Sequence, residues 1–168
     1  MIDHAFVQRL RNIHQTGFSS RPFPGATHTR YAHSLGTMHL AGLAFDAAYR
    51  EWTFQDAGQR AAMRAAVRVA ALCHDLGHAP FSHCMEFAMP PLADLGSKWV
   101  RAEARRASHE DYTINILEQS SLNEVIAQHF PFTAQHVAAL ISREVRVPDD
   151  LFREQGLDHR RLLSQIVS

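Results

Sequence analysis

The chain has 168 residues, a length typical of one domain, and its 46% hydrophobic content is enough to form a core. Its 17 Lys and Arg residues balance its 17 Asp and Glu residues, so no overall charge attracts it to nucleic acid or to an anionic membrane. The sequence has no signal-peptide pattern and no apolar run as long as a membrane span. We therefore expect a cytoplasmic protein with no membrane partner. Nucleic-acid binding stays possible only through local clusters of basic residues.

Hydrophobic spacing predicts helices along the whole chain, and no stretch alternates convincingly like a β-strand. A helix over 5–15 is followed by a loop over 16–28 that is rich in Gly, Ser and Pro. Gly77 is predicted to be the C-cap glycine of a long helix, and Pro80 suits the first turn of the next one. The pattern in the segment 92–107 does not define a helix or a strand. The predicted fold class is all-α. The other predicted helices cover 29–50, 59–76, 80–88, 109–119, 121–129, 133–142, 148–154 and 158–167.

The most informative stretch runs from Leu72 to His83 and reads Leu-Cys-His-Asp-Leu-Gly-His-Ala-Pro-Phe-Ser-His. It places three imidazoles and a carboxylate at the end of a predicted helix. Neutral His is the commonest metal-binding side chain, and an adjacent carboxylate adds an oxygen ligand. A packing role would instead require a dense network of hydrogen-bond partners for so many polar groups. The stretch therefore predicts a metal or phosphate site.

Two other stretches accompany it, Thr29-Arg30-Tyr31-Ala32-His33-Ser34-Leu35-Gly36 upstream and Ser108-His109-Glu110-Asp111-Tyr112 downstream. Together they resemble the HD-domain metal-dependent phosphohydrolases, and the likeness runs from about Phe6 to Ser168. The segments Gln8–Gln15, Phe23–His28 and Gly77–His83 are similar to the deoxynucleoside triphosphate triphosphohydrolase branch. The resemblance implies an HD-domain helical bundle, a nucleotide substrate and a divalent metal ion, with Mn, Fe, Zn, Ni and Mg all left open.

The resemblance also assigns roles to individual residues. It implies that His33, His74 and Asp75 are metal ligands, and that His78 and His109 line the catalytic pocket. Glu86 stands where relatives often place an Asp that works with the catalytic His. The resemblance further implies that three residues contact the substrate: Arg30 on the phosphate chain, Gln15 on the sugar, and His83.

Two of these substrate contacts have plain structural alternatives. Because His83 and Glu86 are three residues apart on a predicted helix, they can simply pair with each other on one face. Gln15 can equally be an ordinary surface glutamine.

A fourth metal ligand, an Asp, is expected from the family in a segment that follows a helix similar to 162–168. Asp149, Asp150 and Asp158 precede that point and do not match the motif. We therefore expect residues 1–168 to form a single HD domain that is a fragment, incomplete at its C-terminus.

The predicted function is hydrolysis of a deoxynucleoside triphosphate to deoxynucleoside and triphosphate. One alternative is a nucleotidase or phosphodiesterase of the same superfamily, and another is a non-catalytic module that binds a nucleotide or a partner subunit. The missing fourth ligand favours the module, whereas His78, His109 and Arg30 favour an enzyme. Relatives are commonly oligomeric, which makes a homo-oligomer possible.

Overall fold

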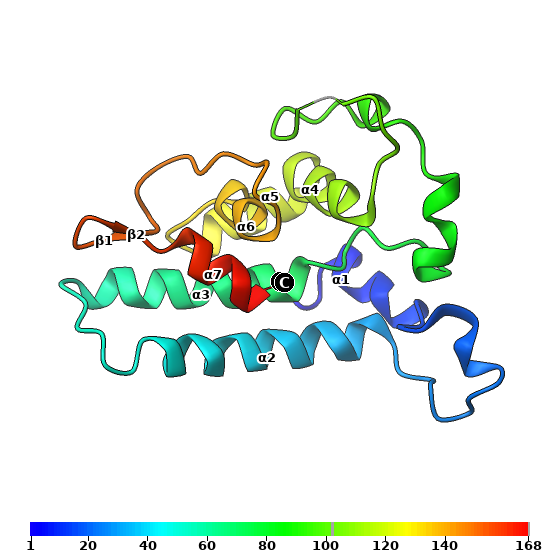
Figure 1. Cartoon of the computed structure of the whole chain (residues 1–168), viewed down its shortest axis with the longest axis horizontal. Helices are drawn as coiled ribbons and strands as arrows, with labels where there is room; N and C mark the ends of the chain where they lie inside the picture. Colours follow the sequence, from blue (N-terminus) through cyan, green and yellow to red (C-terminus); the bar gives the residue numbers. More distant parts are fainter. Residues whose placement is uncertain (102, 168) are drawn as a thin grey trace.

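The computed structural model describes residues 1–101 and 103–167, which fold into a bundle of helices (Figure 1). Two long helices, α2 and α3, lie side by side as a hairpin; α6 packs against α3 and α4, and α7 contacts α2, α3 and α6. The predicted all-α class is confirmed, because one two-stranded sheet is the only other regular structure in the described part of the chain.

The α-helices are α1 (Ala5–Arg9), α2 (Arg30–Ala48), α3 (Ala57–Cys73), α4 (His109–Gln119), α5 (Ser121–His129), α6 (Ala134–Ile141) and α7 (Arg160–Val167). Short 3₁₀ helices are η1 (Leu10–Asn12), η2 (Gly17–Ser20), η3 (Ser82–Ala88) and η4 (Leu92–Leu95). The strands are β1 (Arg153–Glu154) and β2 (Leu157–Asp158), paired antiparallel.

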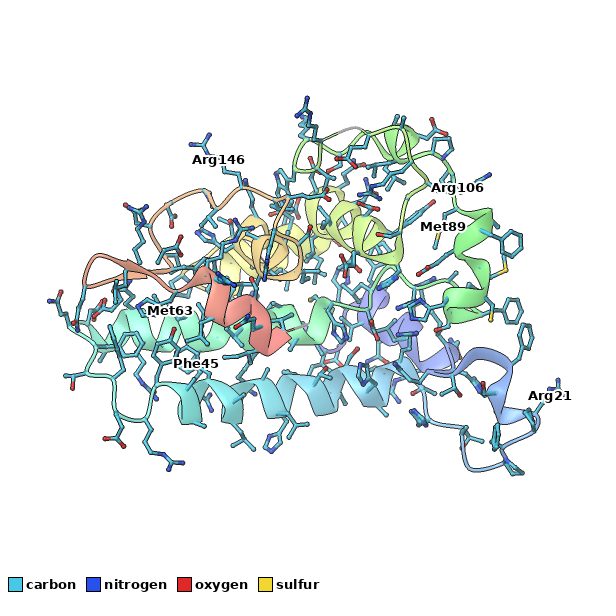
Figure 2. All side chains as sticks on the ribbon, viewed as in Figure 1. Arg21, Phe45, Met63, Met89, Arg106 and Arg146 are labelled. Carbon is cyan, nitrogen blue, oxygen red and sulfur yellow. The ribbon has the colours of Figure 1, made fainter. Side chains whose placement is uncertain are left out.

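The hydrophobic core lies between the α2–α3 hairpin and the later helices. Phe45 of α2 and Met63 of α3, labelled in Figure 2, are both completely buried. Gly42 lets the two helices approach closely, because a Cβ at that position would lie 3.0 Å from the Arg68 side chain of α3. None of the helices within the described residues is long and apolar enough to span a membrane.

Polar residues set the starts of the helices that carry the candidate site. The Thr29 hydroxyl accepts a hydrogen bond from the backbone N–H of Ala32 at the start of α2, and Asp56 caps α3 in the same way. Ser108 and Asp111 form a reciprocal capping box at the start of α4. Such caps satisfy backbone donors that have no partner inside the helix, and they fix where His33 and His109 begin to project from their helices.

The prediction of a helix over 148–154 is wrong, since this segment is irregular and ends in the β1–β2 hairpin. Gln155 and Gly156 have φ angles of +52° and +79°, so both lie in the left-handed region that a tight hairpin turn requires. Helix 80–88 is also corrected, because the regular structure begins at Ser82 and is 3₁₀ rather than α.

The predicted role of Gly77 as a C-cap glycine is wrong as well. α3 ends at Cys73, and Gly77 is not among the glycines with positive φ. Instead, Gly77 lies against the first turn of α4, where a Cβ would come within 2.0 Å of the His109 carbonyl oxygen. Glycine is needed here for close packing, and this contact fixes the distance between the 74–78 segment and α4.

Candidate metal centre and histidine cluster

His33, His74 and Asp75 meet at one point between α2 and the end of α3. The Nε2 atoms of His33 and His74 are 3.3 Å apart, and the Asp75 carboxylate lies 3.2 Å from His74 Nε2 and 3.6 Å from His33 Nε2. Two ligands that each lie about 2.1 Å from one ion are separated by roughly 3.0–3.4 Å. The three groups therefore have the spacing of ligands that share a metal ion.

The orientation of His74 also fits a metal ligand. Its Nδ1 lies 2.7 Å from the carbonyl oxygen of Ala71, one turn earlier in the chain. Because a carbonyl can only accept, Nδ1 carries the proton, and in the neutral ring Nε2 presents a lone pair toward His33 and Asp75. A backbone carbonyl that fixes the tautomer in this way is a common partner of metal-binding histidines.

Asp75 is the electrostatic centre of the site. Its carboxylate is buried and forms an ion pair of 2.6 Å with the equally buried Arg30 guanidinium. Burial alone would raise the pKa of Asp75, but hydrogen bonding to His78 and the charges of His74 and Arg30 hold that pKa well below its usual value. Asp75 is therefore an anion, as a ligand for a divalent cation must be.

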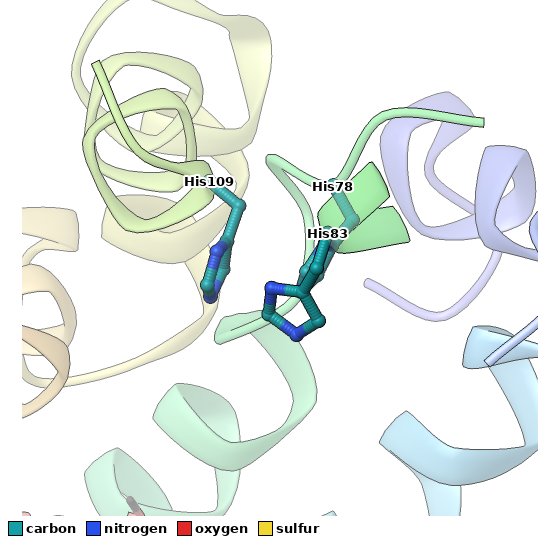
Figure 3. Close-up of side chains that lie close together, drawn as sticks. All are labelled: His78, His83 and His109. Carbon is teal, nitrogen blue, oxygen red and sulfur yellow. The ribbon is translucent and has the colours of Figure 1, made fainter. Parts of the chain in front are cut away.

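A second cluster lies beside the first and contains His78, His83 and His109 (Figure 3). His109 projects from the start of α4, opposite the other two rings. The His78 and His109 rings are stacked, with centroids 3.9 Å apart, and His83 meets both rings edge to face. His78 Nε2 is 3.4 Å from Asp75, so this residue links the two clusters.

Glu86 connects two members of this second cluster. One of its carboxylate oxygens accepts from His109 Nδ1 at 2.7 Å and from His83 Nδ1 at 3.0 Å. Burial would raise the pKa of Glu86, whereas the two imidazole hydrogen bonds lower it below its usual value. The His83–Glu86 pair anticipated from the spacing is present, and Glu86 holds His109 in addition.

Arg30 and Gln15 lie next to the metal site, on the side of η3. Besides its pair with Asp75, Arg30 donates to the Ser82 hydroxyl and to the backbone carbonyl of Gln15. Within the described residues, Gln15 Oε1 is buried and has no hydrogen-bond partner. The side-chain oxygen of Gln15 can therefore still accept a hydrogen bond, whereas the Arg30 guanidinium already donates to Asp75, Ser82 and the Gln15 backbone.

The order of these groups along the chain matches a known family model, the HD domain, over residues 30–159. The chain belongs to the HD domain family. The match begins at Arg30, includes both histidine clusters, and ends at His159 just before α7.

Curated relatives of this HD domain include deoxynucleoside triphosphate triphosphohydrolases named SAMHD1. The chain is 31% identical to the human protein over 174 residues, covering 100% of this chain and 27% of that one. It is 35% identical to the chicken protein, covering 89% and 23%, and 41% identical to a Dictyostelium discoideum homologue, covering 69% and 20%. The HD domain thus spans about a quarter of the length of these relatives and resembles their branch of the family.

A solved structure shares the fold. The crystal structure of a hypothetical protein from Aquifex aeolicus superposes with a TM-score of 0.65 at 28% identity, and the match covers 98% of this chain and 36% of that one.

Sequence reasoning missed the residues that hold the 74–78 segment of this HD domain in place. Thr113 of α4 accepts from the Gly77 N–H at 2.9 Å and donates to the His74 carbonyl at 3.0 Å. Arg9 of α1 donates to the carbonyls of Leu76 and His78. Arg9 lies in a stretch that resembles the family, and Thr113 is four residues after His109, but neither position carries a chemical signal by itself.

Ser82 was also missed as a residue that shapes the site. It is a buried non-glycine residue with a φ of +58°, a left-handed conformation that is costly for serine. In this conformation its hydroxyl reaches the Arg30 guanidinium. The local strain is therefore compensated by a contact that positions the partner of Asp75.

Proposed function

We propose that this domain is a metal-dependent phosphohydrolase that acts on nucleotides, and that its substrate is a deoxynucleoside triphosphate. The observation that carries the proposal is the convergence of His33, His74 and Asp75, with the spacing of shared metal ligands, next to the His78–His109 pair. The similarity to deoxynucleoside triphosphate triphosphohydrolases supports the choice of substrate.

The proposed reaction needs a water, a phosphate and a proton path. Water attacks the α-phosphorus, the bond from phosphorus to the 5′ oxygen breaks, and a proton reaches that oxygen, which gives a deoxynucleoside and inorganic triphosphate. A divalent ion held by the first cluster would supply Lewis acidity and neutralise phosphate charge.

The protein's own residues provide the proton transfer. Since Glu86 accepts from His109 Nδ1, the proton-exchanging atom of His109 is Nε2, which is the arrangement of a general acid or base oriented by a carboxylate. His78 lies between His109 and Asp75, so its ring joins the proton-transfer group to the metal site. We assign Gln15, whose Oε1 has no partner among the described residues, to the sugar and His83 to the phosphate side. Arg30 already pairs with Asp75 and Ser82, so we assign it to the phosphate side through its positive charge.

The test is a product analysis on a panel of nucleotides with the metal-supplemented chain. Release of inorganic triphosphate from deoxynucleoside triphosphates is expected. Release of orthophosphate from a monophosphate would support the nucleotidase alternative, and nucleotide binding without any product would support the regulatory module. Either result would overturn the proposal.

A further inference from the structure

We propose that Arg143, Arg160 and Arg161 form a binding site for a phosphate-bearing anion, outside the metal centre and the histidine cluster. The three side chains line one surface hollow of about 430 Å³, which we call the arginine hollow. Arg143 follows the end of α6, and Arg160 and Arg161 are the first two residues of α7 (Figure 1). None of the described residues that line the hollow belongs to the candidate catalytic site.

Arg160 holds the two walls of the arginine hollow together. Its Nε donates to the Ala139 carbonyl at 3.0 Å, and its Nη2 donates to the carbonyls of Ser142 and Val145 at 3.1 Å and 2.7 Å. These carbonyls lie in the last turn of α6 and just beyond it, where the helix dipole favours a cation. The contact places the start of α7 against the residues that follow α6, and it brings Arg143 into the same hollow.

Positive charge is left unbalanced in the arginine hollow. Asp158 is the only carboxylate among the described residues that line it, and three guanidinium groups line it with Asp158. Asp158 also accepts a hydrogen bond from the backbone N–H of Arg160 at 2.9 Å. The side chains of Arg143 and Arg161 have no hydrogen bond and no ion pair within the part of the chain that the structure describes. Two of the three cations therefore lack a counter-charge.

The pKa of Arg160 reports the effect of this crowding. Burial lowers the pKa of Arg160 below its usual value, the charge of Asp158 opposes that change, and the charge of Arg143 lowers the pKa further. Arginine nevertheless stays protonated in proteins, so the guanidinium groups of Arg143 and Arg160 repel each other. An anion bound between them would replace this repulsion with attraction.

The chemistry of three guanidinium groups selects phosphate. Each planar guanidinium offers paired N–H donors that match two oxygens of a phosphate group, and such charged, paired hydrogen bonds are the strong ones. The volume of the arginine hollow lies within the range of small-molecule sites. The phosphate can belong to a free inorganic polyphosphate or to the phosphate chain of a nucleotide. The binding does not depend on the proposed catalytic reaction, because no residue of that reaction takes part.

The experiment is an NMR titration of metal-stripped protein with inorganic triphosphate, followed through the Nε–H signals of the arginine side chains. The signals of Arg143 and Arg161 should shift and saturate, and binding at the metal centre would not move them. Arg143→Gln and Arg161→Gln should each weaken the affinity by about 10–100-fold, the loss expected when a charged hydrogen-bond donor is removed. The affinity in each variant is read from the signal of the other arginine.

Two more variants control for charge and for geometry. Arg161→Lys keeps the charge but not the paired donors, so its affinity should lie between those of wild type and Arg161→Gln. Arg50→Gln removes an exposed arginine that does not line the arginine hollow, and this matched control should bind like wild type.

A second titration, with a deoxynucleoside triphosphate, distinguishes the two sources of phosphate. Equal affinity for both ligands would support a site that recognises phosphate alone, and tighter binding of the nucleotide would support a nucleotide site. The proposal would be overturned if neither ligand moved the two arginine signals, or if both Gln variants bound like wild type. Shifts caused by single-stranded DNA but not by triphosphate would also overturn it, because the arginines would then serve a nucleic-acid surface.

Discussion

Gly77→Ala tests whether the close contact between the 74–78 segment and α4 holds the site together. The added Cβ would lie 2.0 Å from the His109 carbonyl oxygen, 2.5 Å from the Thr113 nitrogen and 2.7 Å from the Tyr112 Cβ. Non-bonded heavy atoms prefer about 3.5–4.0 Å, so α4 or the loop must move by more than about 1 Å. Two of these three atoms are backbone, which no side-chain rotation can relieve.

The expected cost follows from this geometry. Overpacking a core with extra methyl groups typically costs about 1–3 kcal/mol, and a clash with backbone belongs at or above the upper end. We expect Gly77→Ala to lower the free energy of unfolding by at least about 3 kcal/mol, which corresponds to roughly 6–12 °C in Tm for a domain of this size. Thermal and urea denaturation followed by circular dichroism would measure the change.

Gly36→Ala is the matched control for this substitution. Gly36 lies within α2, and a Cβ there meets nothing within 4 Å. This variant should be more stable than wild type by about 0.5–1 kcal/mol, because alanine favours a helix over glycine. If Gly77→Ala and Gly36→Ala melted at the same temperature, the reasoning about the contact with α4 would be wrong.

Three further predictions concern single side chains near the site. Thr113→Val removes both hydrogen bonds to the 74–78 segment and should lower the free energy of unfolding, measured by urea denaturation, by about 1–3 kcal/mol. Thr113→Ser keeps both hydrogen bonds and should lose less stability. Equal losses in the two variants would argue against a hydrogen-bonding role. His78→Ala should lower turnover by roughly 10²–10⁴-fold while metal bound at His33, His74 and Asp75 persists, and loss of that metal would instead make His78 structural. Burial would raise the pKa of Asp111, but hydrogen bonds from Arg105 and Ser108 hold that pKa below its usual value. The stability that the Asp111 carboxylate contributes is therefore fully present above about pH 3.9 and is lost as the pH falls through the lowered pKa. Accordingly, Asp111→Asn should destabilise the protein at neutral pH and progressively less in acid, and an equal loss at all pH values would contradict the charged pair.

Much of the helical fold could be predicted from the sequence, because amphipathic spacing and capping residues are local signals. The errors fall where tertiary contacts decide the structure. Gly77 has the position of a C-cap glycine in the sequence, yet the approach of α4, more than thirty residues later, determines its role. The segment 148–154 is predicted to be a helix, but the left-handed turn at Gln155 and Gly156 pairs its last two residues with 157–158 in a hairpin.

The site residues were named by resemblance, and their geometry could not have been obtained from spacing alone. The sequence cannot reveal that Arg30 pairs with Asp75, because 45 residues separate them and both are buried by packing between α2 and the 74–78 segment. The same holds for Glu86, which reaches His109 across 23 residues as well as His83 on its own turn. Local motifs identify which side chains carry chemistry, and the packing of distant segments decides which of them meet.

The most direct test of the central claim measures release of inorganic triphosphate from a deoxynucleoside triphosphate as Mn²⁺ is added, for wild type and for His74→Gln. His74 is chosen because its Nε2 lies 3.3 Å from His33 Nε2 and its Nδ1 is held by Ala71, so the substitution removes one ligand from the metal centre. The account predicts that release by wild type rises with Mn²⁺ to a plateau and that His74→Gln shows almost none. Release that needs no divalent ion, or that is undiminished in His74→Gln, would contradict it.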